Sequence, residues 1–502
     1  MTARAIMIQG TASSVGKSIV TTALCRIFRQ EGLRVAPFKA QNMALNAAVT
    51  PDGGEIGRAQ MVQAHAARVV PTVDMNPILL KPEGDSRSQV VVLGKPIGSL
   101  GAVDYHAKKP ELRQVVRDAL DRLRATHDVI VIEGAGSPAE INLKDRDLVN
   151  MYVAGIADAP VILVGDIDRG GVFAAFVGTM ELLEPHERAR VGAFLINKFR
   201  GDVSLLDPGL QFLEKRTGVP VLGVLPYVRR LRIADEDSVS LDDRRAARSS
   251  SADIQIAIVR LPRIANYDDF QPLEHEPGVA VRFVEHVDEL AGADLVVLPG
   301  TKSTASDLGW LRATGFAAAI AARVTRGEPV LGICGGCQML GRAIADPHRI
   351  ESDVELIEGL ALLPVATEFG REKRTAQVRA RAARSTFLSD SGEPVTGFEI
   401  HMGRVERAAG SPATFVVSER NSAPDDDLDG GVSDSGAVVG TMLHGIFENP
   451  QVRATVTAHL RRRKGLPASP SPESAPVDEF DRLAEVVRGN VRMDLLWRLV
   501  GR

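Results

Sequence analysis

The stretch Gly10-Thr11-Ala12-Ser13-Ser14-Val15-Gly16-Lys17-Ser18 has the residue types of a phosphate-binding loop. An apolar run precedes it, and apolar residues recur at helical spacing behind it. In such a strand–loop–helix, backbone N–H groups bind phosphate, the lysine adds positive charge, and the serine hydroxyl binds magnesium. Gly10 lies one residue earlier than usual, and Thr11 takes its place; a plain Gly/Ser turn is the alternative. Phosphate contacts are expected from Gly10, Thr11, Ser13, Val15, Gly16, Lys17 and Ser18.

A second reactive group is Cys334, within Gly332-Ile333-Cys334-Gly335-Gly336-Cys337-Gln338. A cysteine on a sharp turn between a buried strand and a helix is a nucleophile elbow, where the helix N-terminus favours the reactive thiolate. The backbone N–H groups of Gly335 and of Gly300, which follows a neighbouring apolar run, are predicted to form an oxyanion hole. Cys334 and Cys337 also spell CxxC, so a redox pair or half of a zinc site is the alternative.

The nucleophile needs a base, and two of the ten histidines are candidates. His444 follows the apolar run 437–439 in a glycine-bounded loop, which favours it as the base for Cys334. His401, in Phe398-Glu399-Ile400-His401-Met402-Gly403, is the competitor. Outside this context, either histidine would more often have a structural role.

Other polar side chains follow predicted parallel strands, at the edge where doubly wound sheets bind ligands. Glu133 stands where a carboxylate could reach Mg2+ together with Ser18, although a turn-capping acid is the alternative. Lys39 could pair with a phosphate or a substrate carboxylate, or be a surface lysine. Asn197 could contact an adenine edge. Glu55 is a further candidate metal ligand, in a Gly-rich segment expected to be a closing site loop or a plain turn.

These residues fall in two predicted α/β domains. Alternating apolar runs and helical patterns through residues 1–232 predict a doubly wound, mostly parallel sheet, with the phosphate-binding loop after its first strand. Its strands are expected at 5–9, 35–39, 129–133, 160–164, 192–196 and 220–225. The charged, Ser-rich stretch 233–252 is the predicted linker. A second α/β domain is expected over 253–455, and residues 456–502 read as a Pro/Ser spacer and a helical tail. Strands of the second domain are expected at 254–259, 279–284, 295–298 and 330–333.

Composition excludes several classes of protein. The 502 residues have a formal net charge of -4, which provides no footprint for nucleic acid or an anionic membrane. No apolar run approaches the ~20 residues that span a bilayer, and no signal-peptide pattern opens the chain. Three cysteines cannot form a disulfide framework for so long a chain, so a cytoplasmic location is expected.

The elbow with its distant histidine resembles the class I glutamine amidotransferases, whose cysteine attacks the glutamine amide and releases ammonia. The first domain resembles dethiobiotin synthetase in its loop and in Glu133-Gly134-Ala135-Gly136; those enzymes use ATP to activate a carboxylate as a carboxyl phosphate. Their fusion is the plan of the cobyrinic acid amidases of vitamin B12 synthesis.

The resemblance to one branch of that family covers nearly the whole chain before about Pro467. It is carried by long, specific runs, among them Phe38-Lys39-Ala40-Gln41-Asn42-Met43, Gly54-Glu55-Ile56-Gly57-Arg58-Ala59-Gln60, Met75-Asn76-Pro77-Ile78-Leu79-Leu80-Lys81-Pro82, Gly165-Asp166-Ile167-Asp168-Arg169-Gly170-Gly171 and Asn197-Lys198-Phe199-Arg200-Gly201-Asp202. The sister enzyme of the family, cobyrinic acid a,c-diamide synthase, shares the loop and the elbow without these runs.

This resemblance implies amidation of the b, d, e and g carboxylates of a corrinoid, adenosylcobyrinic acid a,c-diamide, with one ATP and one glutamine per amide. It implies Cys334 as nucleophile, His444 as its base, the loop as the ATP site, and Glu133 as a group that serves Mg2+. Many class I glutaminases place a glutamate two residues after the histidine, where this chain has Ile446. Glu448 lies two residues further, so the group that orients His444 stays open.

Two alternatives remain. One is an amidoligase of the same architecture that acts on another polycarboxylate, such as the substrate of the sister synthase or a cell-wall precursor. The other is a nucleotide-switch ATPase of the partitioning type, against which the Cys334–His444 domain argues. The expected cofactors are ATP and Mg2+, and the expected partners are glutamine and a corrinoid. Nucleic acid and membrane are not expected partners, and self-association into a homo-oligomer is left open.

Overall fold

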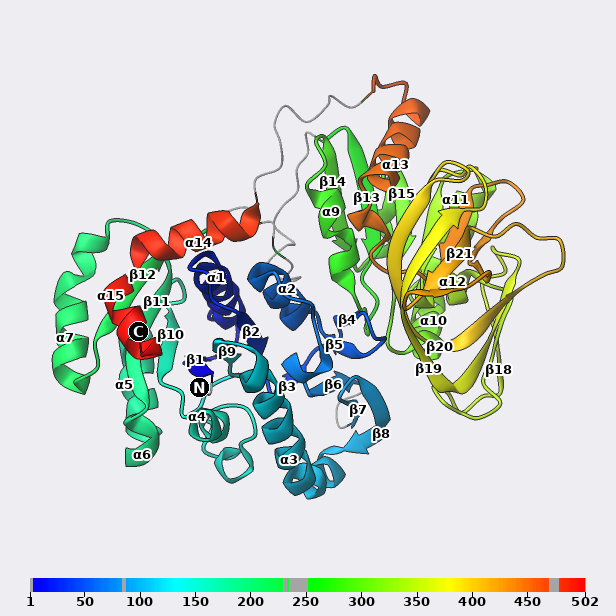
Figure 1. Cartoon of the computed structure of the whole chain (residues 1–502). Helices are drawn as coiled ribbons and strands as arrows, with labels where there is room; N and C mark the ends of the chain where they lie inside the picture. Colours follow the sequence, from blue (N-terminus) through cyan, green and yellow to red (C-terminus); the bar gives the residue numbers. More distant parts are fainter. Residues whose placement is uncertain are drawn as a thin grey trace. The chain divides into compact units, whose positions relative to one another are not determined.

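The computed structural model describes residues 3–83, 87–228, 231, 233, 252–468 and 478–501 (Figure 1). Except for its two ends, the predicted linker 233–252 lies outside the described residues, as do residues 469–477 of the predicted spacer. The described residues divide into two compact units. The first unit holds residues 3–44, 56–228 and 478–501, and the second holds 45–55 and 252–468.

The first unit is built on a parallel sheet with the strand order β12-β11-β10-β1-β9-β2. Its strands are β1 (Arg4–Gly10), β2 (Val35–Phe38), β9 (Val129–Glu133), β10 (Val161–Asp166), β11 (Val191–Phe199) and β12 (Val221–Pro226). Each of the six predicted strands overlaps one of these, and the predicted doubly wound fold is confirmed. Ile6 and Ile8 of β1 pack into one apolar cluster and Met7 into another. Because side chains alternate along a strand, the sheet is buried on both faces.

Helices cover both faces of this sheet. They are α1 (Lys17–Gln30), α2 (Arg58–Ala67), α3 (Ala102–Thr126), α4 (Met151–Ala157), α5 (Val172–Leu182), α6 (Pro185–Arg188) and α7 (Asp207–Thr217), followed by α14 (Glu479–Asn490) and α15 (Met493–Val500). A small sheet of β3 (Gln41–Met43), β6 (Ile78–Pro82), β7 (Arg87–Val92) and β8 (Lys95–Gly101) adjoins them and was not predicted. Among the described helices, none is long and apolar enough to cross a membrane.

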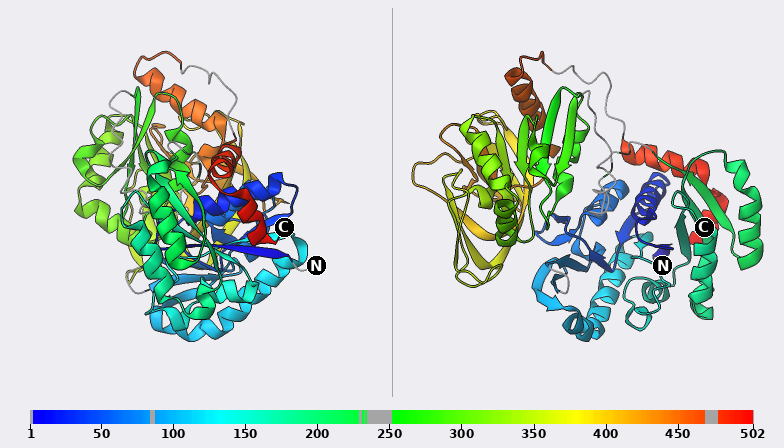
Figure 2. Two further views of the ribbon diagram at one scale, coloured as in Figure 1. Left: turned by 90° about the vertical axis from the view of Figure 1, so that its left-hand side faces the viewer. Right: turned by 180° about the vertical axis from the view of Figure 1, so that it is seen from behind.

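The C-terminal helices belong to the first unit. Figures 1 and 2 show α14, in red, beside α1, in dark blue. Arg26 of α1 is buried and forms ion pairs with Asp478 and, at 2.8 Å, with Asp481. Phe28 packs against Trp497, with ring centroids 5.3 Å apart. The predicted helical tail is therefore a structural part of the first unit.

The second unit contains a six-stranded sheet in the order β14-β13-β15-β16-β25-β24. Its strands are β13 (Ile254–Val259), β14 (Val279–Val284), β15 (Leu295–Leu298), β16 (Val330–Ile333), β24 (Gly431–Val432) and β25 (Val438–Thr441), and only β24 is antiparallel. The four predicted strands of this domain are present with the predicted bounds. Its helices include α9 (Gln271–Glu274), α10 (Thr304–Ala313), α11 (Phe316–Thr325), α12 (Gly335–Leu340) and α13 (Pro450–Arg463). The predicted boundary at residue 455 falls inside α13.

A second, seven-stranded sheet of this unit was not predicted. Its long hairpin joins β19 (Val365–Ala382) to β20 (Pro394–Arg407), and its other strands are β17 (Ala343–Ala345), β18 (Leu356–Glu358), β21 (Phe415–Arg420), β22 (Ala423–Pro424) and β23 (Leu428–Asp429). Residues 45–55, which include β4 (Ala47–Val49) and the first residue of β5 (Glu55–Gly57), fold with this unit although they lie inside the predicted first domain.

Candidate functional site

The phosphate-binding loop follows β1 and leads into α1. Gly16 has a φ of 100°, in the left-handed region, and a Cβ there would lie 2.1 Å from Nδ2 of Asn197, so only glycine fits. The Lys17 ammonium donates to the carbonyls of Ala12 at 3.0 Å and Gly136 at 3.2 Å. These carbonyls belong to the loops after β1 and β9, so Lys17 is held at the carboxyl ends of two neighbouring strands.

The Glu133 carboxylate at the end of β9 is fully buried and hydrogen-bonded. It accepts hydrogen bonds from the Ser18 hydroxyl and the Lys39 ammonium, each at 2.9 Å, and from the Gln63 amide at 2.5 Å. Ser18 and Glu133 are hard oxygen donors of the kind that Mg2+ prefers. Within the described residues, no group of three or more His, Cys, Asp or Glu side chains could hold a metal ion. A Mg2+ ion that is bound by one carboxylate, one hydroxyl and the phosphates of a nucleotide does not need a cluster of three such side chains. Ser18 and Glu133 therefore fit a Mg2+ site.

Two predicted ligands have other partners in the structure. The Asn197 side-chain amide donates to the carbonyl of Val15 at 2.9 Å, so Asn197 supports the loop, and its contact with an adenine edge stays a prediction. Glu55 is buried in the second unit, where its carboxylate pairs with the Lys373 ammonium at 2.5 Å. The Lys373 ammonium compensates the buried charge of Glu55, and a metal at Glu55 stays a prediction. Within the segment 52–58, which was expected to be a closing loop or a plain turn, Glu55 is buried and the Thr375 hydroxyl donates to the Gly53 carbonyl at 2.7 Å.

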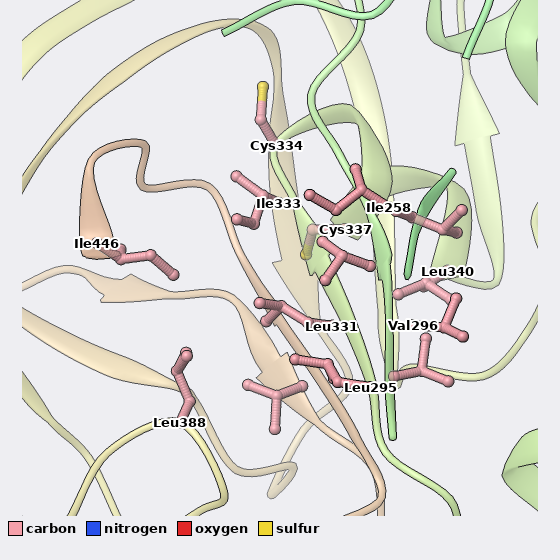
Figure 3. Close-up of a cluster of buried hydrophobic side chains, with 14 of the residues drawn as sticks. Ile258, Leu295, Val296, Leu331, Ile333, Cys334, Cys337, Leu340, Leu388 and Ile446 are labelled. Carbon is pink, nitrogen blue, oxygen red and sulfur yellow. The ribbon is translucent and has the colours of Figure 1, made fainter. Parts of the chain in front are cut away.

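Cys334 occupies a strained turn between β16 and α12. Its φ of 51° and ψ of -112° are unusual for a residue with a side chain, as a nucleophile elbow requires. In Figure 3 its side chain points away from the labelled apolar residues, whereas Cys337 lies among them. Burial raises the pKa of Cys337 well above its usual value, and both cysteines are free thiols. These features favour the nucleophile over a redox pair.

His444 is held by Asp269, a residue that the sequence analysis did not single out. Nδ1 of His444 lies 2.6 Å from Oδ2 of Asp269, and the Gly445 N–H donates to the other carboxylate oxygen at 2.8 Å. Cys334 also acts on the imidazole, because it is among the groups that raise the pKa of His444. Burial lowers the pKa of His444, but Asp269 and Cys334 outweigh burial and raise it to about 10. Cys334, His444 and Asp269 therefore form a Cys–His–Asp triad. Asp269 is the group that orients His444, a role that the sequence assigned neither to Ile446 nor to Glu448.

The competing histidine has a different environment. Nδ1 of His401 lies 3.0 Å from the carbonyl of Gly403 within β20, and burial lowers the pKa of His401. A histidine with a lowered pKa stays neutral at pH 7, so it cannot stabilise a thiolate as an imidazolium. His444, whose pKa is raised, is therefore favoured over His401 as the base for Cys334.

The two predicted oxyanion glycines lie beside the triad. Gly335 is the first residue of α12, so its N–H has no partner within the helix. A Cβ built on Gly335 would lie 3.2 Å from the backbone nitrogen of Thr301, and one built on Gly300 would lie 2.8 Å from the His444 ring. The loop after β15 therefore packs directly against the elbow and the histidine.

Asp269 could have been considered from one signal in the sequence. Asn266-Tyr267-Asp268-Asp269 follows the predicted strand 254–259, and acids beyond strand ends are candidates in this fold. The residue lies 175 positions before His444, so spacing alone does not connect the two.

Replacement of Asn197 tests whether this residue supports the phosphate-binding loop or recognises the adenine base. In Asn197→Ala, the loss of the hydrogen bond to Val15 is expected to raise the KM for ATP by about fivefold, which corresponds to about 1 kcal/mol. The ratio of kcat/KM for ATP to that for GTP should stay at the wild-type value in steady-state assays. A collapse of that ratio would instead assign Asn197 to the adenine.

Replacement of Asp269 tests the triad through its pH dependence. Asp269→Asn removes the anion that raises the pKa of His444, so the imidazolium should lose its proton at lower pH. The rate of glutamine hydrolysis is expected to fall by about 100-fold or more, and its alkaline limit to move to lower pH. The neighbouring Asp268→Asn is the matched control. An unchanged alkaline limit in Asp269→Asn would contradict the triad.

Comparisons with known proteins agree with the two units. Residues 6–241 match the family model described as the CobQ/CobB/MinD/ParA nucleotide binding domain, and residues 255–452 match the CobB/CobQ-like glutamine amidotransferase domain. A relative from Sorangium cellulosum (strain So ce56), named cobyric acid synthase, is 62% identical over 516 residues, which cover 100% of this chain and 99% of the relative.

Two further relatives have the same name. The protein from Pelotomaculum thermopropionicum is 52% identical over 99% of this chain and 97% of its own length. The protein from Dehalococcoides mccartyi (strain CBDB1) is 50% identical over 99% of both chains. Identity of this extent confirms the expected resemblance to the cobyrinic acid amidases, and the chain belongs to the cobyric acid synthase family.

Proposed function

We propose that this protein is a glutamine-hydrolysing, ATP-dependent amidoligase that converts adenosylcobyrinic acid a,c-diamide into adenosylcobyric acid in cobalamin biosynthesis. It amidates the b, d, e and g carboxylates, with one ATP and one glutamine for each amide. The observation that carries this proposal is a Cys334–His444–Asp269 triad in the same chain as a phosphate-binding loop with a buried acid, Glu133. Full-length identity to relatives named cobyric acid synthase supports the choice of substrate.

The second unit would release ammonia from glutamine. The Cys334 thiolate attacks the carbon of the side-chain amide, and the negative oxygen that forms accepts hydrogen bonds from the N–H groups of Gly335 and Gly300. The amide nitrogen leaves as ammonia with a proton from the His444 imidazolium, which Asp269 orients. Water then hydrolyses the thioester to glutamate, with His444 as the base.

The first unit would activate the corrinoid carboxylate. A carboxylate oxygen attacks the γ-phosphorus of ATP, ADP leaves, and Lys17 stabilises the charge on the phosphate oxygens. Ammonia then attacks the carboxyl phosphate, and the C–O bond to phosphate breaks to give the amide and inorganic phosphate. Mg2+, bound through Ser18 and Glu133, would neutralise phosphate charge. Lys39 would hold Glu133 in place through their buried ion pair.

The alternative functions have less support. A partitioning-type nucleotide switch has no use for the Cys334–His444–Asp269 triad. The sister a,c-diamide synthase remains the closest competitor in chemistry, and the site at which nitrogen enters the corrinoid distinguishes the two. The relatives at 50% to 62% identity favour the b, d, e and g carboxylates.

The variant Cys334→Ser tests the division of labour between the units. It is expected to abolish glutamine-dependent amidation, because the serine hydroxyl stays protonated, and to retain amidation with ammonium chloride. The corrinoid product is measured by mass spectrometry with each nitrogen source. Loss of both activities in a folded variant would contradict separate glutaminase and ligase sites.

The variant Glu133→Gln tests the ligase half. Both glutamine-dependent and ammonium-dependent amidation are expected to fall by about 100-fold, because the Mg2+ ligand is lost. The variant should also unfold more easily, since loss of one partner of a buried ion pair costs about 3–5 kcal/mol. Glutamine hydrolysis measured without nucleotide should remain. Wild-type amidation in this variant would exclude Glu133 from the site.

A further inference from the structure

The segment 45–55 leaves the first unit and returns to it, but folds with the second. Shortly before it stands Lys39, and shortly after it stands Gln63. Both side chains donate to the Glu133 carboxylate, at 2.9 Å and 2.5 Å. The two chain ends of the segment are therefore tied to the same buried acid of the nucleotide-binding unit.

One side of the segment contacts the turn that carries Asp269. The Ala47 N–H donates to Oδ1 of Asn266 at 2.9 Å, and the Tyr267 N–H donates to Oδ1 of Asn46 at 3.3 Å. Asn266 has a φ of 53°, and its carbonyl accepts the N–H of Asp269 at 3.0 Å. Asn46 and Asn266 are both buried, so the exchange holds the turn in place without solvent.

The other side of the segment contacts β19. Glu55 pairs with Lys373, the Thr375 hydroxyl donates to the Gly53 carbonyl, and the Gln377 amide donates to the Val49 carbonyl. Thr375 is paired with Ile400 of β20, whose carbonyl lies 3.8 Å from Sγ of Cys334. The segment is thus connected to Cys334 by contacts through the β19–β20 hairpin, and to His444 by contacts through the turn that carries Asp269.

We propose that residues 45–55 are a coupling segment, through which the ligand state around Glu133 sets the alignment of the Cys334–His444–Asp269 triad. This inference rests on the proposed function. Nucleotide and Mg2+ would give Ser18, Lys39 and Glu133 new partners. The hydrogen bonds that Lys39 and Gln63 donate to Glu133 would then change, and with them the position of the chain before and after the segment. A ligand shifts an equilibrium only by its differential affinity for two states, so an aligned triad must also favour ligand binding. Glutamine would then be hydrolysed fast only when an acceptor is being activated.

The first test uses two threonine variants in the full-length enzyme. Thr375→Val removes the hydroxyl that bonds Gly53, whereas Thr396→Val removes a hydroxyl that bonds Asn449 elsewhere in the same unit. Glutaminase rates are measured without ligand, with Mg-ATP alone, and with Mg-ATP and the corrinoid. The wild type and Thr396→Val should be stimulated by about fivefold or more. Thr375→Val should lose at least half of this stimulation and keep ammonium-dependent amidation within about twofold.

A second variant acts on the other side of the segment. Asn46→Ala removes the Oδ1 atom that accepts from the Tyr267 N–H, and should lower kcat for glutamine hydrolysis about tenfold with little change in KM. The alkaline limit of its pH profile should move to lower pH, in the same direction as in Asp269→Asn, a shift that a general loss of folded enzyme would not produce.

Three outcomes overturn the coupling. These are a wild-type glutaminase that ignores Mg-ATP and corrinoid, equal stimulation in Thr375→Val and the wild type, and an unchanged pH profile in Asn46→Ala. Each of these outcomes is compatible with amidation of all four carboxylates, so none of them would contradict the proposed function. Failure of amidation in the wild type would instead overturn the proposed function, while the response of glutaminase to Mg-ATP alone still decides the coupling.

Discussion

Both sites depend on buried charges that have fixed partners. Glu133 is fully buried with Lys39 beside it, and His444 is 1% exposed with Asp269 at 5%. An ionised group away from water is tolerated only when it is paired and hydrogen-bonded, so each pair also fixes the position of its members. The surrounding loops are arranged to satisfy these groups, with the Gly445 N–H on Asp269 and the Ser18 hydroxyl on Glu133.

The same fold solution is used twice. In each unit a buried, mostly parallel sheet brings the loops after several strands to one edge, where the reactive groups meet. The phosphate-binding loop and Glu133 follow neighbouring strands β1 and β9, and Cys334 and His444 follow neighbouring strands β16 and β25. Rigid strands therefore determine how closely the groups approach, and the loops supply the chemistry.

The sequence predicted the parts of this arrangement that local pattern determines. Apolar runs bounded by turn residues predicted the parallel strands, and the glycines around Lys17 and Cys334 predicted the loop and the elbow. Asp269 and the support role of Asn197 depend on contacts between distant parts of the chain, which periodicity does not encode. The hairpin β19–β20 was missed because its buried face alternates with many charged residues, such as Arg379 and Arg381, and resembles a polar loop.

The domain boundaries show the same limit. Residues 45–55 lie among the motifs of the nucleotide-binding unit, so the sequence placed them there. Their partners are Asn266, Lys373, Thr375 and Gln377, all from the second unit. Burial against these partners decides where the segment folds, and Glu55 becomes one half of a buried ion pair with Lys373.

The most direct test of the central claim follows nitrogen from glutamine into the corrinoid. The protein is incubated with adenosylcobyrinic acid a,c-diamide, Mg-ATP and glutamine labelled with nitrogen-15 in its side-chain amide, and the product is analysed by mass spectrometry and nuclear magnetic resonance. Four labelled amides at the b, d, e and g positions, formed only when ATP is present, are the predicted result. An unaltered corrinoid, in the presence of active glutaminase and ATPase, would contradict the account of the substrate.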